Sequence, residues 1–333
     1  MSHHCHEPEH DTPGFPRPNR KLLISIAVIF AVYLVSFHPS LASLHASLTA
    51  YVTLISWAVA LGFVLGGCID YFVPDNVVAG LLGNQHRWSI LNAALAGLLM
   101  SACSHGILAI AVELHKKGAG TPAVITFLLA SPWANLPISI LLFGLFGWSA
   151  LFFIGGALSI AVVTGFIYRL LDQRGWIEPS PEARIDTRSD WYRLREFELR
   201  PALAGVGSGA MSLANMVLWW IIVGVLAAAV IGAYVPEHFF MQYLGPDLPG
   251  LFVTLLVASV IEVCSEGSSP IAFEIFNKVG VLGNPFVFLM AGVVTDYTEI
   301  GLLWTNIGRR TAIFLPLVTV PQVMLLATWL NSL

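Results

Sequence analysis

The sequence predicts an all-α integral membrane protein. Hydrophobic residues make up 56% of the chain, charged residues only 11%, and the mean hydropathy is +0.77, beyond what a soluble chain of 333 residues needs for its core. Strand-like alternation is absent, and the apolar runs approach the roughly 20 residues of a membrane-spanning helix. These runs lie near 22–38, 49–74, 88–115, 121–145, 147–170, 208–236, 250–278, 283–306 and 309–331.

Two polar regions interrupt the apolar pattern. Residues 1–21 form a tail rich in His and Pro, which we expect to be disordered and cytoplasmic. Basic residues near its end could mimic a signal peptide, but the polar stretch before them is long for one. Residues 171–203 mix seven acids with six arginines, which is typical of a solvated linker between two membrane halves.

An internal repeat relates these halves. Residues 103–130 align without gaps to residues 264–291 at an offset of 161, with ten of the 28 positions identical. Shared Cys, Glu and Lys residues are not explained by apolar bias. In the alignment Cys103 matches Cys264, His105 matches Glu266, and Asn135 matches Asp296 a few positions later.

The placement of Lys and Arg predicts the topology, because cytoplasmic loops are rich in these residues. If residues 88–117 and 250–278 enter the membrane and return as hairpins broken at Cys-Ser-x-Gly, fifteen of the sixteen basic residues lie inside. If all nine runs cross, the basic linker lies outside. We therefore predict two re-entrant hairpins, a cytoplasmic N-terminus, an external C-terminus and location in the inner membrane.

This topology predicts an inverted repeat. Each half contains three crossings and one hairpin, so the second half lies upside down relative to the first. Broken helices that meet at the midplane in an inverted repeat are typical of secondary transporters. The predicted regions are a tail (1–21), an extra transmembrane helix and loop (22–48), repeat 1 (49–170), a cytoplasmic linker (171–203) and repeat 2 (204–333).

The hairpin tips carry metal-ligating residue types. Cys103, His105, Cys264 and Glu266 would supply two thiolates, an imidazole and a carboxylate, a set suited to a soft or borderline ion such as Zn(II) or Cu(I). The alternative is that the cysteines are packing residues, which we prefer for the isolated Cys68. The predicted substrate-binding set is Cys103, Ser104, His105, Asn135, Cys264, Ser265, Glu266 and Asp296.

Acidic residues are concentrated in apolar surroundings of the second half. An ionised carboxylate is costly there and tends to mark an ion or proton pathway. We expect Glu262, Asp296 and Glu299 to couple transport to protons, the alternative being structural pairing with neighbouring hydroxyls. Glu113 and Glu274, nearer the hairpin exits, are interpreted as gate or snorkelling residues.

The N-terminal tail offers a second set of metal-ligating residues. Its first ten residues include His3, His4, Cys5, His6 and His10. This composition fits a metal-collecting tail and equally a plain disordered segment.

The two tip regions resemble a known family. "CSHG…KKGAGTPAVITFLLASP" and "VCSEGSSPIAFEI…FVFLMAG" are similar to the signature regions of the ArsP-like predicted permeases. That resemblance implies efflux of organoarsenicals or, in one branch, of copper and zinc. The family's first signature commonly has Cys-Ser-Cys-Gly, whereas His105 occupies the second cysteine's position here, which favours a metal such as zinc over an arsenical.

The predicted function is therefore a secondary-active permease that exports a soft or borderline metal ion or a trivalent organoarsenical, without a cofactor and with the proton as coupling ion. A passive ion channel is the alternative, although thiolate ligands bind too tightly for fast conduction. A membrane-embedded enzyme is less favoured, because the HExxH and GxSxG motifs are absent. The expected partners are the lipid bilayer and the small inorganic or organometalloid substrate; nucleic acid is not expected.

Overall fold

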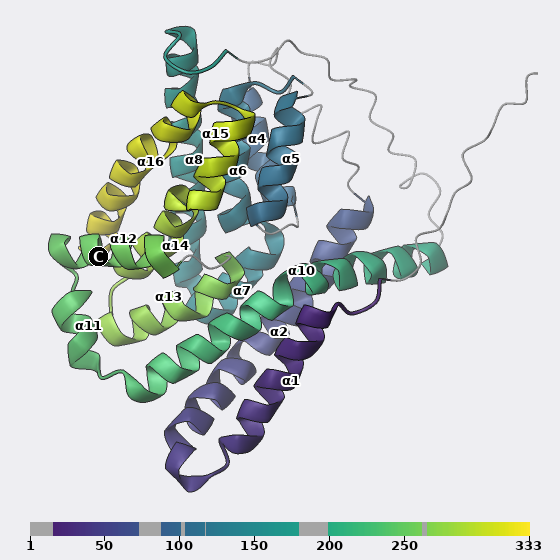
Figure 1. Ribbon diagram of the computed structural model, residues 1–333, viewed down its shortest axis with the longest axis vertical. Helices are drawn as coiled ribbons and strands as arrows, with labels where there is room; N and C mark the ends of the chain where they lie inside the picture. The colour runs from purple at the N-terminus through teal and green to yellow at the C-terminus, as the bar shows by residue number, and fades with distance from the viewer. Residues whose placement is uncertain (1–15, 73–87, 101–103, 117, 180–198, 262–264) are drawn as a thin grey trace, which may run out of the picture.

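The computed structural model describes residues 16–72, 88–100, 104–116, 118–179, 199–261 and 265–333. Within these ranges every regular element is a helix, as the composition predicts (Figure 1). The first half contains α1 (Arg20–Val35), η1 (Pro39–Leu41), α2 (Ala42–Phe72), α4 (Ser89–Leu99), α5 (Ser104–Lys116), α6 (Thr121–Ala134), α7 (Leu136–Phe146), η2 (Gly147–Ser149) and α8 (Ala150–Gln173). The second contains α10 (Leu199–Tyr234), α11 (Glu237–Tyr243), α12 (Leu248–Ile261), α13 (Ser265–Val279), α14 (Gly283–Thr295), α15 (Tyr297–Asn306) and α16 (Arg309–Leu330).

Five helical stretches of the described chain are long and apolar enough to cross a membrane. The number rises to six if α11 and α12, bent by 104° at their junction, form one span. Seven crossings were predicted; the difference arises because α1 has 16 residues and because the run 121–145 is divided into α6 and α7. The spans are Pro39–Cys68, Leu136–Gln173, Val217–Tyr234, Gly283–Asn306 and Arg309–Leu330.

Helix boundaries repeat along the chain at the spacing of the sequence repeat. The starts of α5 and α13, the ends of α6 and α14, and the starts of α7 and α15 are each 161 residues apart. The packing repeats too: α4, α5 and α8 contact α6, whereas α12, α13 and α16 contact α14. The opposite orientation of the two halves in a membrane stays a prediction.

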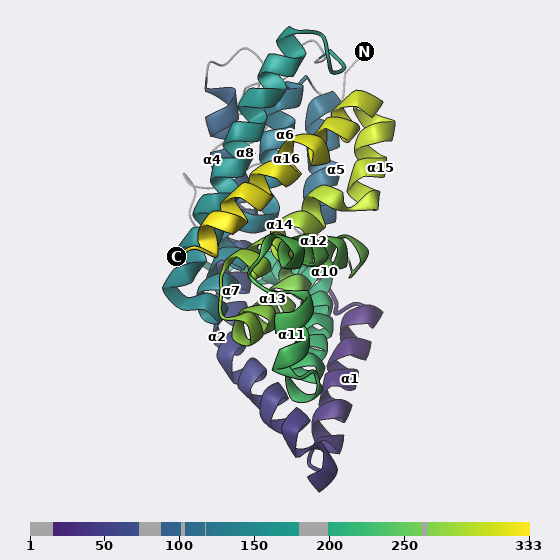
Figure 2. The ribbon, with the colours of Figure 1, turned by 90° about the vertical axis from the view of Figure 1, so that its left-hand side faces the viewer.

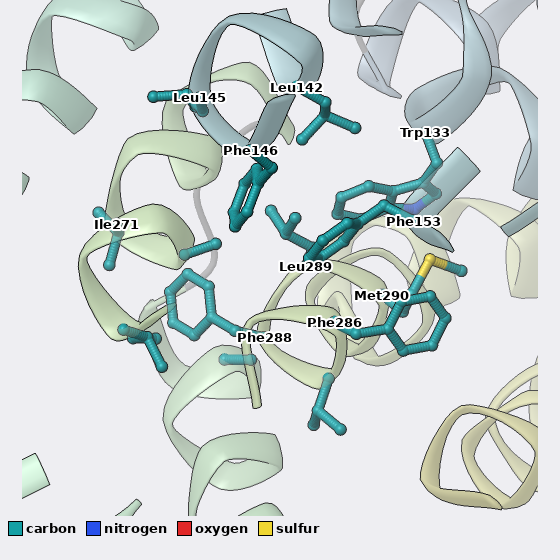
Figure 3. Packing of buried hydrophobic residues seen from close by; sticks show 14 of the residues in the cluster. Trp133, Leu142, Leu145, Phe146, Phe153, Ile271, Phe286, Phe288, Leu289 and Met290 are labelled. Atoms are coloured by element: carbon teal, nitrogen blue, oxygen red, sulfur yellow. The ribbon is translucent and has the colours of Figure 1, made fainter. Parts of the chain in front are cut away.

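The two halves are interlocked. Helix α7 of the first half packs against α13 of the second, and α15 of the second half packs against α5 of the first. Figures 1 and 2 show α14, α15 and α16 beside α4–α8, whereas α10 lies along α2. The larger hydrophobic cluster draws on both halves; at its centre the rings of Phe146, Phe153 and Phe286 pack together (Figure 3).

Small residues set the closest contacts between helices. A Cβ atom added to Gly67 of α2 would lie 2.3 Å from the carbonyl oxygen of Val206 in α10, and one added to Gly224 of α10 would lie 1.9 Å from that of Gly267 in α13. Between helices in lipid, association depends on such close packing because hydrocarbon tails are as apolar as the side chains. The glycines therefore hold α10 against both α2 and α13.

Candidate functional site

A pocket lies between four helices, two from each half. It is narrow, because the space that the centre of a water molecule can reach inside it is only about 10 Å³. Most of its wall is apolar, and the polar side chains at its lining are those of Asn135 and Glu266. The lining residues are Val59, Gly62 and Phe63 of α2, Asn135 and then Pro137 and Leu141 of α7, Leu213, Val217 and Ile221 of α10, and Glu266 of α13.

Glu266 reaches the pocket because α13 begins beside it. Helix α13 starts at Ser265, directly after the second predicted hairpin break, so Glu266 lies in its first turn. A carboxylate there interacts favourably with the positive end of the helix dipole. The contact between Gly224 and the Gly267 backbone brings this end of α13 against α10. Glu266 is only 4% exposed, so it is a buried acid at a helix N-terminus.

Asn135 lies at a break between two short helices. It ends α6 and caps α7, where its Oδ1 accepts a hydrogen bond of 2.9 Å from the backbone N–H of Ile138. Pro137, at the second position of α7, needs no hydrogen-bond partner for its nitrogen, which suits a first turn. The break was not predicted, although Asn followed two residues later by Pro is a start signal for a helix.

A second polar cluster surrounds the matching break in the other half. Asp296 separates α14 from α15, and its Oδ1 accepts a hydrogen bond of 3.2 Å from the backbone N–H of Glu299. Glu299 is 1% exposed, and neither of its carboxylate oxygens has a hydrogen-bond partner among the described residues. Such a carboxylate is costly to keep charged without a partner.

The structure brings together only some of the predicted site residues. Asn135 and Glu266 share the pocket, whereas Asp296 and Glu299 are not among the residues that line it. Ser265 is buried beside Glu266 in sequence, and its hydroxyl has no partner among the described groups. The side chains of Ser104 and His105 are not described, although both positions belong to α5. Outside the described residues lie Cys103, Glu262, Cys264, His3, His4, Cys5, His6 and His10.

Metal ligation at the tips is therefore untested by the geometry. Among the described side chains, no three His, Cys, Asp or Glu residues come together as ligands for a metal ion. Three of the four predicted tip ligands lie beyond that set, because the two cysteines and the His105 side chain are not described. The described part of the pocket supplies one carboxylate and one amide.

The walls of the pocket could not be predicted from motifs. Helices α2 and α10 contribute residues such as Val59 and Val217, which differ in no visible way from other apolar positions. Tyr51 of α2 was also missed; its hydroxyl donates a hydrogen bond to the Glu274 carboxylate, 223 residues away. Its position in an apolar run offered no signal.

The fold and the pocket define the class of this protein. Several long apolar helices, together with short helices broken at polar residues around a central pocket, are features of multi-pass membrane transporters. Residues 40–332 match the model of the predicted-permease family ArsP_1, and the chain belongs to that family. This membership indicates a transporter rather than an enzyme.

Two curated relatives are similar to the chain over most of its length. The chain is 27% identical to the UPF0718 protein YcgR of Bacillus subtilis (strain 168) over 274 residues, which cover 81% of this chain and 90% of that protein. It is 29% identical over 255 residues to the protein named "Putative permease Rv2963" in Mycobacterium tuberculosis (strain ATCC 25618 / H37Rv), covering 67% of this chain and 60% of that one. No solved structure matches the chain.

Proposed function

We propose that this permease exports a soft or borderline metal ion, of the Zn(II) or Cu(I) type, or a trivalent organoarsenical, in exchange for protons. One feature carries the proposal: Glu266, two residues after Cys264 in the sequence, lines a pocket together with Asn135 from the other half. A pocket shared by two halves suits alternating access, because movement of one half against the other changes its exposure.

The chemistry of the tips supports the class of substrate. Thiolate and imidazole groups prefer soft and borderline metal ions, and a carboxylate adds charge for a cation. In the sequence, the first tip contains Cys103 and His105. The helix that follows each tip packs against a helix of the other half: α5 against α15, and α13 against α7. We infer that Cys103, His105, Cys264 and Glu266 bind the substrate, with Ser104, Ser265, Asn135 and Asp296 around them.

Proton coupling is supported by the second polar cluster. The carboxylate of Glu299 has no hydrogen-bond partner among the described groups, and Asp296 is three residues away on the same turn. A carboxylate that releases a proton when it binds a cation, and takes up a proton when it releases the cation, allows a proton gradient to drive export. Glu262, two residues before Cys264 in the sequence, completes the proposed set. The orientation that this function requires is the predicted one, with the N-terminus in the cytoplasm and the C-terminus outside.

Two measurements on the purified protein and on membranes test this function. Equilibrium binding is measured with Zn(II), Cu(I) and a trivalent arsenical for the wild type, Cys264→Ser and Glu266→Gln, with Cys68→Ser as the matched control. Uptake of the bound species into everted vesicles is then measured with and without an imposed pH gradient. We expect binding that both tip variants weaken and the control retains, and uptake that follows the gradient. Failure of all three probes to bind contradicts the substrate class.

A further inference from the structure

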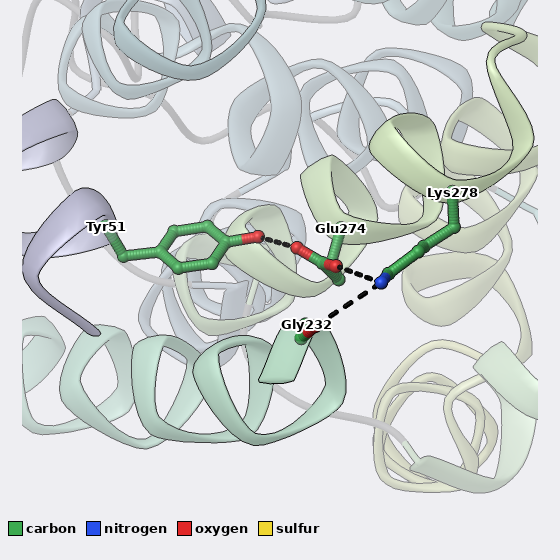
Figure 4. A network of polar contacts seen from close by, with 4 residues as sticks. All are labelled: Tyr51, Gly232, Glu274 and Lys278. Atoms are coloured by element: carbon green, nitrogen blue, oxygen red, sulfur yellow. Dashed lines mark hydrogen bonds and ion pairs between the residues drawn. The ribbon is translucent and has the colours of Figure 1, made fainter. Parts of the chain in front are cut away.

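A buried polar network joins α2, α10 and α13 on one side of the pocket. The hydroxyl of Tyr51 in α2 donates a hydrogen bond to Oε2 of Glu274 in α13 (Figure 4). The other carboxylate oxygen, Oε1, lies 3.7 Å from Nζ of Lys278, one turn further along α13. Lys278 Nζ also donates a hydrogen bond of 3.3 Å to the carbonyl oxygen of Gly232 in α10. Three helices are thus tied together by one carboxylate and one ammonium group.

The network occupies the helices that form the pocket. Tyr51 is eight residues from the pocket residue Val59 in α2, and Glu274 is eight residues from Glu266 in α13. Eight residues of an α-helix rise about 12 Å. The network therefore forms a layer roughly 12 Å from the pocket, towards the end of the bundle where α10 leads into α11.

Each of the three helices carries a buried apolar residue between the two layers. Ile55 of α2, Val225 of α10 and Ile271 of α13 lie between them in sequence, and all three are buried. The fit at the network is also close, because a Cβ atom added to Gly232 would lie 3.0 Å from Oε1 of Glu274. On this side the pocket is closed first by an apolar layer and then by the polar network.

We propose that Tyr51, Glu274 and Lys278 form the gate that closes the pocket towards the side of α11 (Glu237–Tyr243). The gate opens when α13 moves away from α2, which breaks the hydrogen bond between Tyr51 and Glu274. A buried carboxylate that loses its hydrogen-bond donors needs water molecules in their place. Breaking the contact is therefore coupled to the entry of water into the pocket. This inference rests on the membership of the permease family and is independent of the substrate.

Thiol labelling in intact membranes tests the gate without a substrate. A cysteine replaces Val59 in the pocket wall, an impermeant maleimide is applied to the face on which His238→Cys reacts, and mass spectrometry quantifies the modification of residue 59. Losing one hydrogen bond to a charged group shifts an equilibrium about tenfold. We therefore expect Tyr51→Phe, which removes this hydrogen bond, and Glu274→Gln, which removes the charge that pairs with Lys278, each to accelerate labelling of residue 59 by about tenfold.

The control is Tyr168→Phe. Tyr168 is buried, as Tyr51 is, but its hydroxyl donates to the carbonyl oxygen of Thr311, on α16, rather than to the network. It should leave labelling of residue 59 unchanged. The gate is excluded if folded Tyr51→Phe protein, which keeps the aromatic ring, labels at the wild-type rate. It is also excluded if Tyr168→Phe accelerates labelling as much, because the effect is then a general loosening of the bundle.

Discussion

Asn135 and Asp296 hold the same structural position in the two halves of the protein. Each separates two short helices, and each accepts a hydrogen bond from the backbone N–H three residues later, at 2.9 Å for Asn135 and 3.2 Å for Asp296. The residues that donate are Ile138 and Glu299, so a buried carboxylate in the second half replaces a buried isoleucine in the first. The same capped helix break thus places an uncharged pocket residue in the first half and a titratable group in the second.

The role of Asn135 as a helix cap can be tested separately from its role as a pocket residue. Asn135→Ala removes the side chain that accepts from Ile138, and losing such a cap costs about 1 kcal/mol. Asn135→Ser keeps a capping oxygen and loses the amide at the pocket. We expect a lower thermal unfolding midpoint in detergent for the alanine variant and a near-wild-type midpoint for the serine variant, with weaker substrate binding in both. Equal midpoints for all three proteins would show that the cap contributes nothing.

The acidic residues are expected to separate binding from coupling. Asp296→Asn, Glu299→Gln and Glu262→Gln each keep the shape of the side chain and lose the titrating group. We predict that these variants retain substrate binding but lose transport driven by a pH gradient, measured in everted vesicles. Glu237→Gln, at an exposed position in the first turn of α11, is the matched control and should transport normally. Wild-type transport in the three variants would mean that the carboxylates are structural.

We expect the cysteines at the hairpin tips to be required for the resistance of cells to the exported metal or metalloid. Cys103→Ser and Cys264→Ser should each abolish tolerance of cells to the exported metal or metalloid without reducing the folded protein in the membrane, because Ser is nearly isosteric but a poorer ligand for soft ions. His105→Cys should shift preference from Zn(II) towards Cu(I) or trivalent arsenicals. Cys68, a half-buried residue of α2, serves as the control. If both tip variants are silent and Cys68→Ser is not, the tip thiols are packing residues.

Glu178 predicts a pH dependence of stability. It follows α8 and caps α16, where its Oε1 accepts from the backbone N–H of Arg310 at 2.9 Å and its Oε2 from that of Thr311 at 3.0 Å. Partial burial would raise its pKa, but these hydrogen bonds, together with one from the Thr311 hydroxyl, lower it below the ordinary value of 4.5.

A lowered folded-state pKa means that the charged form stabilises the fold. This contribution is fully present above the unfolded value and is lost as the pH falls through the folded value. We expect Glu178→Gln to unfold at a lower temperature than the wild type at pH 7, with the difference shrinking as the pH falls below 4.5. A difference that stays constant with pH would show that the charge of Glu178 plays no part. Asp172→Asn, in the last turn of α8, is the control.

The sequence alone determined the class of the protein, because membrane segments and repeats are recorded in local composition. The apolar runs predicted the helices, and the offset of 161 predicted the spacing at which α5 and α13 begin. The family followed from the same two signature regions. The sequence also pointed to helix starts next to Cys103 and Cys264, since α5 and α13 begin at the serines that follow them.

Tertiary structure alone decided which residues meet. Asn135 and Glu266 are 131 residues apart in the chain, and they share a pocket only because α7 packs against α13 while α2 and α10 close the sides. Tyr51 contacts Glu274 for the same reason. A pattern within one helix specifies which face is apolar, but in a helix that is apolar on nearly every face it does not specify the neighbour. Close packing of complementary surfaces makes that choice, at glycines such as Gly224, and those surfaces exist only in the folded chain.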